Sequence, residues 1–521
     1  MIVLINSAAN GSSEPFASDE IVEPGIEPGA STETMLVTTD NIDDYESNMN
    51  SSLDDSQIKN VDNDTPVVQV ISQTEIRSEH LNESVSLNTD ADQKDIVDQM
   101  SQCNIDVDPL RCKLWLAQKK HIFVLSQAGK PVYSRHSPED KLVTIMGVMQ
   151  ALVSFIQAGN DTIRSVHAGD TNFVFSLKGP LILVAVSKTL ESVPQLLNQL
   201  SYVYNQILFV LTQSTLTRVY EQRRNFDLRR LLSGSERLID HLINFMDREP
   251  AFFLGAVKCL PLLPSMRDLI TQTIVQTCGK IKNLVFGLLL ANNQLVTLVR
   301  MKKFFIHPAD LHLIQNLVAS SESFKTAEGW TPICLPKFNA NGFMHGHVSY
   351  LAEDCQACLL LLTADRDVFP ILSEAKQKIV EKLRRTNCLE AINESMNRAL
   401  ITTMEIGLPE MRHVLYKCRS TAQFWSPGFQ SPYTNDEEIE RLLGQYQCLH
   451  HQLHAVNRPL KLIFQQMHNE TMLAWVTSGF ELYATFEPLV TKPDAINAVN
   501  KLIKWIKKEE DRLFILNSPT F

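Results

Sequence analysis

The stretch KHIFVLSQAGKPVYSRHSPEDKLVTIMGVMQALVSFI (residues 120–156) decides the fold of this chain. It reads as a strand, a turn that contains glycine, a second strand and a helix, with Ser137 as the N-cap and Pro138 in the first helical turn. Three more strand patterns follow (DTIRSVHAG, TNFVFSLKG and LILVAVSKT), and then two long helical stretches. The order β-β-α-β-β-β-α-α predicts an antiparallel sheet covered by helices.

The same order of elements returns twice. A second copy begins at KNLVFGLLLANNQLVTLVR, where Asn292 and Asn293 mark a hairpin turn, and a third, looser copy begins at MRHVLYKCRSTAQFW. Three copies give about 138 residues each, a normal domain size. The sequence therefore predicts an α+β chain of three domains, each an antiparallel sheet of about five strands flanked by helices. The expected boundaries are 109–255, 256–405 and 406–521.

Residues 1–108 form an acidic leader before these domains. They hold 23 acidic against three basic residues, one Phe and one Tyr, and no sustained hydrophobic period. Such a segment cannot bury enough apolar surface to offset its chain entropy, so we expect it to be disordered. The remaining residues hold 36 acidic and 45 basic side chains. This mildly basic part suits an anionic partner without identifying one.

The sequence also predicts the compartment. The opening residues MIVLINSAAN lack the basic start of a secretory signal, and no stretch reaches the ~18 apolar residues of a membrane span. The ten cysteines are scattered through the chain, as reduced thiols are in cytosolic proteins. We therefore expect a cytoplasmic protein whose membrane contacts are peripheral.

The helix within residues 137–159 has two apolar sides. One stripe, at i, i+3, i+4, i+7 spacing, is wide enough to cover a sheet; its members are Leu142, Ile145, Met146, Met149, Leu152, Val153 and Ile156. Val148, Ala151 and Phe155 form a second stripe, and Thr144 extends it toward the N-terminus. A helix that is apolar on two sides is buried on both, so either another domain of this chain or a protein partner covers the second stripe.

Two histidines have the spacing of metal ligands. His450 and His454 in HHQLH lie at i and i+4 on one helical face. No Glu follows the first His, as the helix of zinc proteases would require, and no third ligand is evident nearby. A surface or partly packed pair is the favoured interpretation.

The remaining metal-type motifs are weaker. Cys355 and Cys358 in CQAC open an apolar strand, on which residues i and i+3 face opposite ways, so they are interpreted as core cysteines. His345 and His347 share a strand face but lack further ligands. We therefore expect no metal and no cofactor.

Motifs for nucleotide binding or covalent catalysis are absent from the sequence. It contains neither GxxxxGK[ST] nor a GxGxxG after a strand, and no GxSxG. Basic pairs such as Arg384–Arg385 and Lys507–Lys508 lack the interleaved aromatics of nucleic-acid grooves, although some could contact anionic lipid. The sequence thus argues against an enzyme that makes or breaks bonds and against a nucleic-acid partner.

Several blocks of the sequence resemble one family. They are KHIFVLSQAGKPVYSRHSPEDKL (120–142), AGDTNFVFSLKGPLILVAVSK (168–188), LPLLPSMRD (260–268) and TPICLPKFNANGFMHGHVSYL (331–351). Their text and order resemble the Mon-one/SAND proteins over nearly all of residues 109–521. The resemblance implies three longin domains, the sheet-and-helix units of trafficking proteins.

The resemblance also implies a function. It implies pairing with the three-longin protein Ccz-one, and in animals with a third scaffold subunit. The expected assembly is a guanine-nucleotide exchange factor for the late-endosomal GTPase Rab-seven. It is recruited by Rab-five and by phosphoinositide-rich, anionic membrane, and it serves endosome maturation and fusion of autophagosomes with lysosomes. The expected location is therefore cytoplasmic, with peripheral recruitment to early and late endosome, lysosome or autophagosome membranes.

The resemblance further implies that the first longin domains of both partners together form the working surface. The residues expected at the partner or Rab surface are Thr144, Val148, Ala151 and Phe155, with Val132, Tyr133 and Arg135 as second choices. Two alternatives stay open: a longin-type adaptor or tether without exchange activity, and a metal-dependent or hydrolytic enzyme that uses His450, His454 or Cys355.

Overall fold

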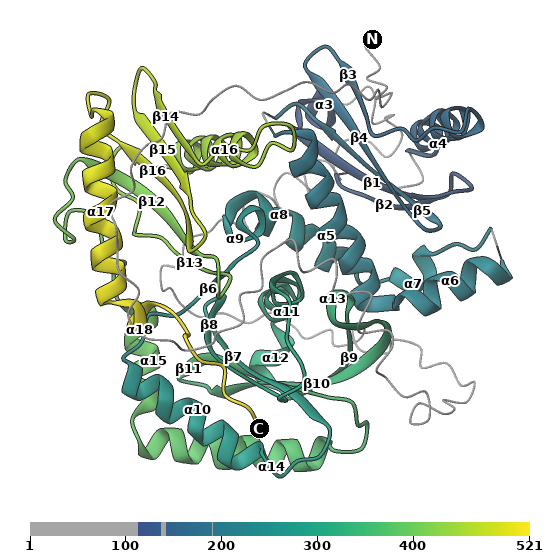
Figure 1. Cartoon of the computed structure of the whole chain (residues 1–521). Helices are drawn as coiled ribbons and strands as arrows, with labels where there is room; N and C mark the ends of the chain where they lie inside the picture. The colour runs from purple at the N-terminus through teal and green to yellow at the C-terminus, as the bar shows by residue number, and fades with distance from the viewer. Residues whose placement is uncertain (1–112, 137–141, 190, 224) are drawn as a thin grey trace, which may run out of the picture. The chain divides into compact units, whose positions relative to one another are not determined.

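The structure is a computed structural model that describes residues 113–136, 142–189, 191–223 and 225–521. The acidic leader and the expected helix start at Ser137 and Pro138 lie outside the described residues. Three largely antiparallel β-sheets with flanking helices account for most of the described chain (Figure 1).

The first sheet has five strands in the order β2-β1-β5-β4-β3. Strand residues alternate between two cores: Ile122 and Val124 face one, whereas Phe123 and Leu125 face the other. This period of two is the geometric consequence of a pleated strand with both faces covered. The strands are β1 (Lys120–Ser126), β2 (Pro131–Ser134), β3 (Ser165–Ala168), β4 (Thr171–Lys178) and β5 (Leu181–Ser187).

Helices cover both faces of the first sheet. Helix α4 packs on the face that carries Phe123, and α5 packs on the face that carries Ile122. Helix α5 begins with a capping box in which Ser192 and Gln195 bond each other's backbone, as the sequence Ser-Val-Pro-Gln favours. The helices are α3 (Lys113–Ala117), α4 (Val143–Ala158), α5 (Val193–Leu211), α6 (Gln213–Gln222), α7 (Arg229–Leu232), α8 (Glu236–Arg248) and α9 (Ala251–Leu254).

The second sheet repeats this arrangement in the order β8-β7-β11-β10-β9. Its β7–β8 hairpin turns at Asn292 and Asn293, both at positive φ, as predicted for this dipeptide. Its strands are β7 (Leu284–Ala291), β8 (Gln294–Arg300), β9 (Gly329–Leu335), β10 (Ala340–Ala352) and β11 (Cys355–Thr363). Its helices are α10 (Pro264–Cys278), α11 (Pro308–Ser320), α12 (Ser323–Thr326), α13 (Pro336–Asn339), α14 (Phe369–Arg385) and α15 (Cys388–Asn397).

The third sheet has six strands, in the order β14-β15-β16-β12-β13-β6. The sixth strand, β6 (Val257–Lys258), comes from the segment between the first two sheets and pairs in parallel with β13. The other strands are β12 (Met411–Cys418), β13 (Gln423–Trp425), β14 (Leu462–Gln466), β15 (Thr471–Val476) and β16 (Phe480–Phe486). The helices are α16 (Asp436–Leu453), α17 (Lys492–Lys508) and α18 (Glu510–Leu513). The predicted α+β repeat of about five strands with helices is therefore confirmed.

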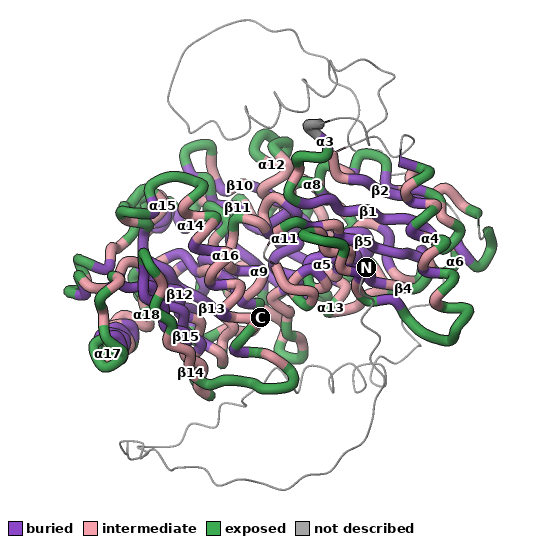
Figure 2. Tube along the Cα trace, turned by 90° about the horizontal axis from the view of Figure 1, so that it is seen from above, coloured by how far each residue is buried: buried purple, intermediate pink, exposed green. Residues whose placement is uncertain are grey.

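One hydrophobic cluster joins all three sheets. It includes Ile207 of α5, Leu313 of α11 and Tyr446 of α16, together with one face of each sheet. The opposite faces carry α4, the α10–α14–α15 group and α17, each with a separate core (Figure 1). In Figure 2 the strands β1, β2 and β5 are buried. The inner helices are thus shared between sheets, which leaves the outer helices as the places where a helix can present a free side.

Candidate partner-binding face

Helix α4 lies on the first sheet through the apolar stripe that the sequence predicts. Met146, Met149 and Val153 are buried against Phe123 and Phe175 of the sheet, and Ile145, Leu152 and Ile156 are partly buried against the same core. This placement confirms the inner stripe, and it fixes which side of α4 points away from the sheet.

The opposite side of α4 is exposed and largely apolar. Thr144, Val148, Ala151 and Phe155 are all exposed, and they lie at i, i+4, i+7 and i+11 along the helix. We call these four residues the outer face of α4. Val148 is 65% and Phe155 77% exposed, and the neighbouring Val143, which the sequence reasoning did not select, is 48% exposed. No described part of the chain covers this face. Among the described residues no other domain of this chain covers the second stripe, and its covering by a protein partner stays a prediction.

Hydrogen bonds hold α4 beside the β1–β2 turn. The Gln150 side-chain amide donates to the Gln127 carbonyl at 3.2 Å and to the Ser154 hydroxyl at 2.9 Å. Gly129 in that turn has a φ of +77°, which favours glycine, and a Cβ there would lie 3.5 Å from Gln150. The outer face is therefore carried on a helix whose position is fixed by both its core and this turn.

The second-choice surface residues lie elsewhere. Val132 and Tyr133 are buried, and the Tyr133 hydroxyl donates to the Asp240 carboxylate of α8. Arg135 is half-buried and donates to Asn244 at 2.8 Å. Tyr133 and Arg135 fasten edge strand β2 and the residue after it to α8, and the burial of Val132 and Tyr133 removes both from the surface of the chain. The alternating sequence of strand β2 could not predict that its residue Tyr133 contacts α8.

A buried cluster of charges lies at the start of β1. The Lys120 ammonium contacts Glu191 at 3.1 Å, Asp247 at 2.5 Å and the Gln199 side-chain oxygen at 3.0 Å. Burial acts to lower the pKa of Lys120, but Asp247 and Glu191 outweigh it, and the pKa is raised. Lys120 therefore stays charged and ties β1 to α5 and α8.

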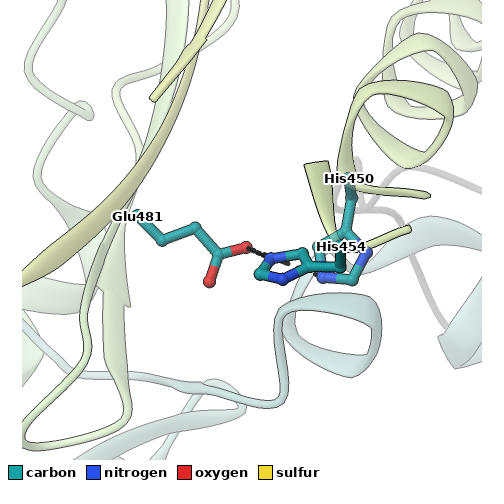
Figure 3. Close-up of side chains that lie close together, drawn as sticks. All are labelled: His450, His454 and Glu481. Carbon is teal, nitrogen blue, oxygen red and sulfur yellow. Dashed lines mark hydrogen bonds and ion pairs between the residues drawn. The ribbon is translucent and has the colours of Figure 1, made fainter. Parts of the chain in front are cut away.

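The histidine pair of α16 acquires a third neighbour in the fold. His454 Nε2 lies 3.0 Å from Glu481 Oε1, and His450 Nε2 lies 3.6 Å from the same oxygen (Figure 3). Burial lowers the pKa of His450 to about 4. Although burial acts to raise the pKa of Glu481, His454 and Lys417 hold it well below its usual range. Glu481 lies on β16, away from the two histidines in the sequence, and the tertiary fold brings it next to them.

Of the remaining motif residues, Cys355, Cys358 and His347 are buried and His345 is half-buried. Cys355 and Cys358 belong to clusters on opposite faces of the second sheet, as predicted. Burial raises the pKa of Cys358 to about 12 and also raises that of Cys355, so neither thiol is a ready nucleophile. His347 bonds Glu328 at 2.9 Å, whereas the His345 ring stacks on Trp330.

Two outer helices end in basic side chains. Lys382, Arg384 and Arg385 lie in the last turn of α14, and Lys507 and Lys508 in that of α17. Such positions complement the negative end of a helix dipole and also suit contact with an anionic surface. Among the described helices, none is both long and apolar enough to cross a membrane.

Family models match all three sheet-and-helix units. The matches are the first, second and third longin domains of FUZ, MON1 and HPS1, at residues 120–242, 282–381 and 410–510. The chain therefore contains three longin domains, which confirms the predicted architecture. One solved structure, a bacteriophytochrome of R. palustris, aligns with 75% of this chain and 95% of its own, at 8% identity. The TM-score of this alignment is 0.17, which is too low to bear on the fold.

Curated relatives extend this match along the chain. The vacuolar fusion protein MON1 homolog A of Gallus gallus is 50% identical over 78% of this chain and 74% of its own length. The corresponding Homo sapiens protein is 49% identical over 78% of this chain, and the match covers 62% of the human protein's length. Protein SAND of Takifugu rubripes is 48% identical over 80% of this chain and 79% of its own. The chain thus belongs to the MON1/SAND family, the one that its sequence blocks resemble.

Proposed function

We propose that this chain is a subunit of a guanine-nucleotide exchange factor that acts together with Ccz-one on Rab-seven. Membership of the MON1/SAND family supports this proposal, and so do relatives that are named vacuolar fusion proteins. The observation that carries it is the outer face of α4, where Val148 and Phe155 are exposed on a well-anchored helix. Apolar patches of this kind commonly mark protein interfaces.

Exchange requires binding surfaces and no nucleophile. A surface that binds the nucleotide-free GTPase more tightly than the loaded form lowers nucleotide affinity by the same factor, because binding free energies are linked. Tenfold faster release corresponds to a barrier lower by ~1.4 kcal/mol. In this mechanism the complex pulls a switch loop of the GTPase away from Mg²⁺ and phosphate, so that Mg²⁺ and nucleotide leave.

The first longin domain supplies the surface in this proposal. Thr144, Val148, Ala151 and Phe155 contact Ccz-one or Rab-seven, and the exposed rings and methyl groups lose water in the complex. Burying a Val or Phe side chain contributes about 1.5–3 kcal/mol, so two such anchors suffice for an effect on exchange. Arg135 stays a neighbouring candidate from the sequence, although its side chain is only 11% exposed and bonds Asn244 and Asp247.

Recruitment and location follow from the same assignment. We place the protein in the cytoplasm and on early and late endosome, lysosome and autophagosome membranes, through Rab-five, phosphoinositide-rich lipid and, in animals, a third scaffold subunit. Its activity would serve endosome maturation and autophagosome–lysosome fusion. The basic ends of α14 and α17 support a lipid contact, at ~1 kcal/mol per residue near an anionic surface. We also propose domain boundaries at 109–255, 256–405 and 406–521.

A nucleotide-release assay tests the function. Rab-seven loaded with a fluorescent guanine nucleotide is mixed with the purified complex of this chain and Ccz-one, with each subunit alone, and with a non-cognate Rab as the control. We expect faster release only from Rab-seven and only with the complex. If the complex binds Rab-seven without accelerating release, the chain is a longin-type adaptor or tether instead.

A further inference from the structure

The C-terminal end of α16 and strand β16 bring together three side chains of the kind that bind zinc. His450 and His454, the latter immediately after the last residue of α16, present their Nε2 atoms to the Glu481 carboxylate (Figure 3). One nitrogen or oxygen from each residue lies within 4.8 Å of the others. Two imidazoles and one carboxylate are a ligand set of known zinc sites.

The two separations from Glu481 Oε1 are compatible with a shared metal ion. In a tetrahedral site with metal–ligand bonds of 2.0–2.2 Å, neighbouring ligand atoms are about 3.4 Å apart. The distances from Glu481 Oε1 to the two histidine nitrogens are 3.0 and 3.6 Å, on either side of that value. A hydrogen bond explains the shorter contact, but 3.6 Å is too long for one. His450 therefore faces the Glu481 carboxylate without a hydrogen bond to it.

Further contacts orient the ligands. The Tyr483 hydroxyl donates to Glu481 Oε1 at 2.5 Å, and the Lys417 ammonium lies 3.3 Å from the other carboxylate oxygen. The His450 ring packs at 5.5 Å, edge to face, against Phe253 of α9. Groups that hold ligands in this way are a regular feature of metal sites. Oε1 of the deeply buried Glu481, which accepts from Tyr483, is also the oxygen that faces the two histidines.

The cluster is also reachable from solvent. The side chain of His454 is 40% and that of His450 23% exposed, whereas that of Glu481 is 2% exposed. An ion can therefore enter from the His454 side, and a water molecule can complete four ligands there.

We propose that His450 Nε2, His454 Nε2 and Glu481 Oε1 bind one Zn²⁺ ion, with water as the fourth ligand. The ion ties the end of α16 to β16 and so fastens the inner helix of the third longin domain to its sheet. The proposed ion is independent of the proposed exchange activity. Zinc is the expected metal because imidazole nitrogens favour it over Mg²⁺ and Ca²⁺, which prefer oxygen.

Metal titration of the full chain tests this proposal. The chain is stripped with a chelator and titrated with Co²⁺, whose visible bands report tetrahedral coordination, and Zn²⁺ then displaces the Co²⁺. The variants are H450A and H454A. H451A is the matched control, because it removes a histidine of the same helix that is absent from the cluster. Comparison with H451A also subtracts binding by other histidines and cysteines.

We expect the wild-type chain and H451A to bind one more Co²⁺ per chain than H454A. The visible bands should lack thiolate charge transfer, and affinity at this site should fall at least tenfold in both ligand variants. Zn²⁺ should raise the melting temperature of the wild-type chain and H451A but not of H454A. His454 is exposed, so H454A carries the test even if H450A disturbs the fold. Equal stoichiometry and affinity in all four proteins would overturn the proposal.

Discussion

The Tyr202 hydroxyl, on α5 of the first longin domain, donates a hydrogen bond to His312 Nδ1, on α11 of the second, at 2.9 Å. His312 Nε2 lies 3.0 Å from the Ala256 carbonyl, which can only accept, so Nε2 carries the proton and Nδ1 accepts from Tyr202. Both side chains are buried. This pair therefore fixes the packing of two domains through one neutral imidazole.

The His312 pair makes stability depend on pH. Burial lowers the pKa of His312 to about 4, whereas the unfolded value is 6.5. Between these values the unfolded chain binds the extra proton, so stability is full above about pH 6.5 and falls as pH drops toward 4, by about 3 kcal/mol for this group. We expect His312→Gln to be less stable than the wild-type chain at pH 7.5, with a gap that narrows toward pH 4.5.

Urea unfolding across this pH range measures that gap. Asp310, whose pKa is raised by burial to about 7, titrates with the opposite sign but is present in both proteins, so it largely cancels from the difference. Tyr202→Phe is the matched control, because it removes the hydrogen bond and keeps the imidazole. A gap between His312→Gln and the wild-type chain that does not change with pH would refute the neutral-imidazole assignment.

Two adjacent lysines are expected to differ sharply in their effect on stability. Lys120→Met leaves the buried Glu191 without its cation and Asp247 with Arg135 alone, a change that costs about 3–5 kcal/mol. Lys119→Met removes only an exposed ion pair with Glu440, worth at most about 1 kcal/mol. Urea denaturation of both variants checks this. Similar losses of unfolding free energy would show that the Lys120 cluster does not stabilise the first domain.

The acidic leader is expected to affect recruitment and not exchange. Its balance of 23 acidic to three basic residues suits regulation of contacts with charged surfaces. Deleting residues 1–100 should leave the nucleotide-release rate in solution within twofold of the full chain, while binding to phosphoinositide vesicles changes. Vesicle flotation and the release assay on the same preparation separate the two effects. A large loss of release in solution would contradict this prediction.

The repeated fold could be predicted because its signals are local. Ile122 and Phe123 already show the period of two that places them in different cores, and Asn292 and Asn293 specify their hairpin. Hydrophobic periodicity also distinguished the buried stripe of α4 from the exposed Phe155 on its other side. These patterns depend on neighbours within a few residues, so they are visible in the sequence.

Contacts between distant segments could not be predicted in the same way. Strand β6 has two residues, too few for a periodic signal, and its partner β13 follows more than 160 residues later. The sequence allows Tyr133 to be a surface residue, whereas in the fold its hydroxyl bonds Asp240 of α8. Glu481 joins His454 only because β16 packs against α16. Each case needs the tertiary fold, which brings the residues together.

Substitutions on α4 test whether its outer face serves exchange. Phe155→Asp places a charge on the exposed side, so the fold should persist while contact with Ccz-one or Rab-seven weakens. Gln157→Asp, exposed on the same helix but outside the outer face, is the matched control. Met146→Asp, on the buried side, should instead lower the melting temperature, since it buries an unpaired carboxylate.

The most direct measurement is the rate of nucleotide release from Rab-seven by the Ccz-one complex that carries Phe155→Asp. The rate is compared with that of the wild-type and Gln157→Asp complexes at equal concentration and with matched melting curves. We predict a rate at least tenfold lower for Phe155→Asp, or ~1.4 kcal/mol in the barrier, and an unchanged rate for Gln157→Asp. Full exchange by a folded Phe155→Asp complex would contradict the role of the outer face of α4.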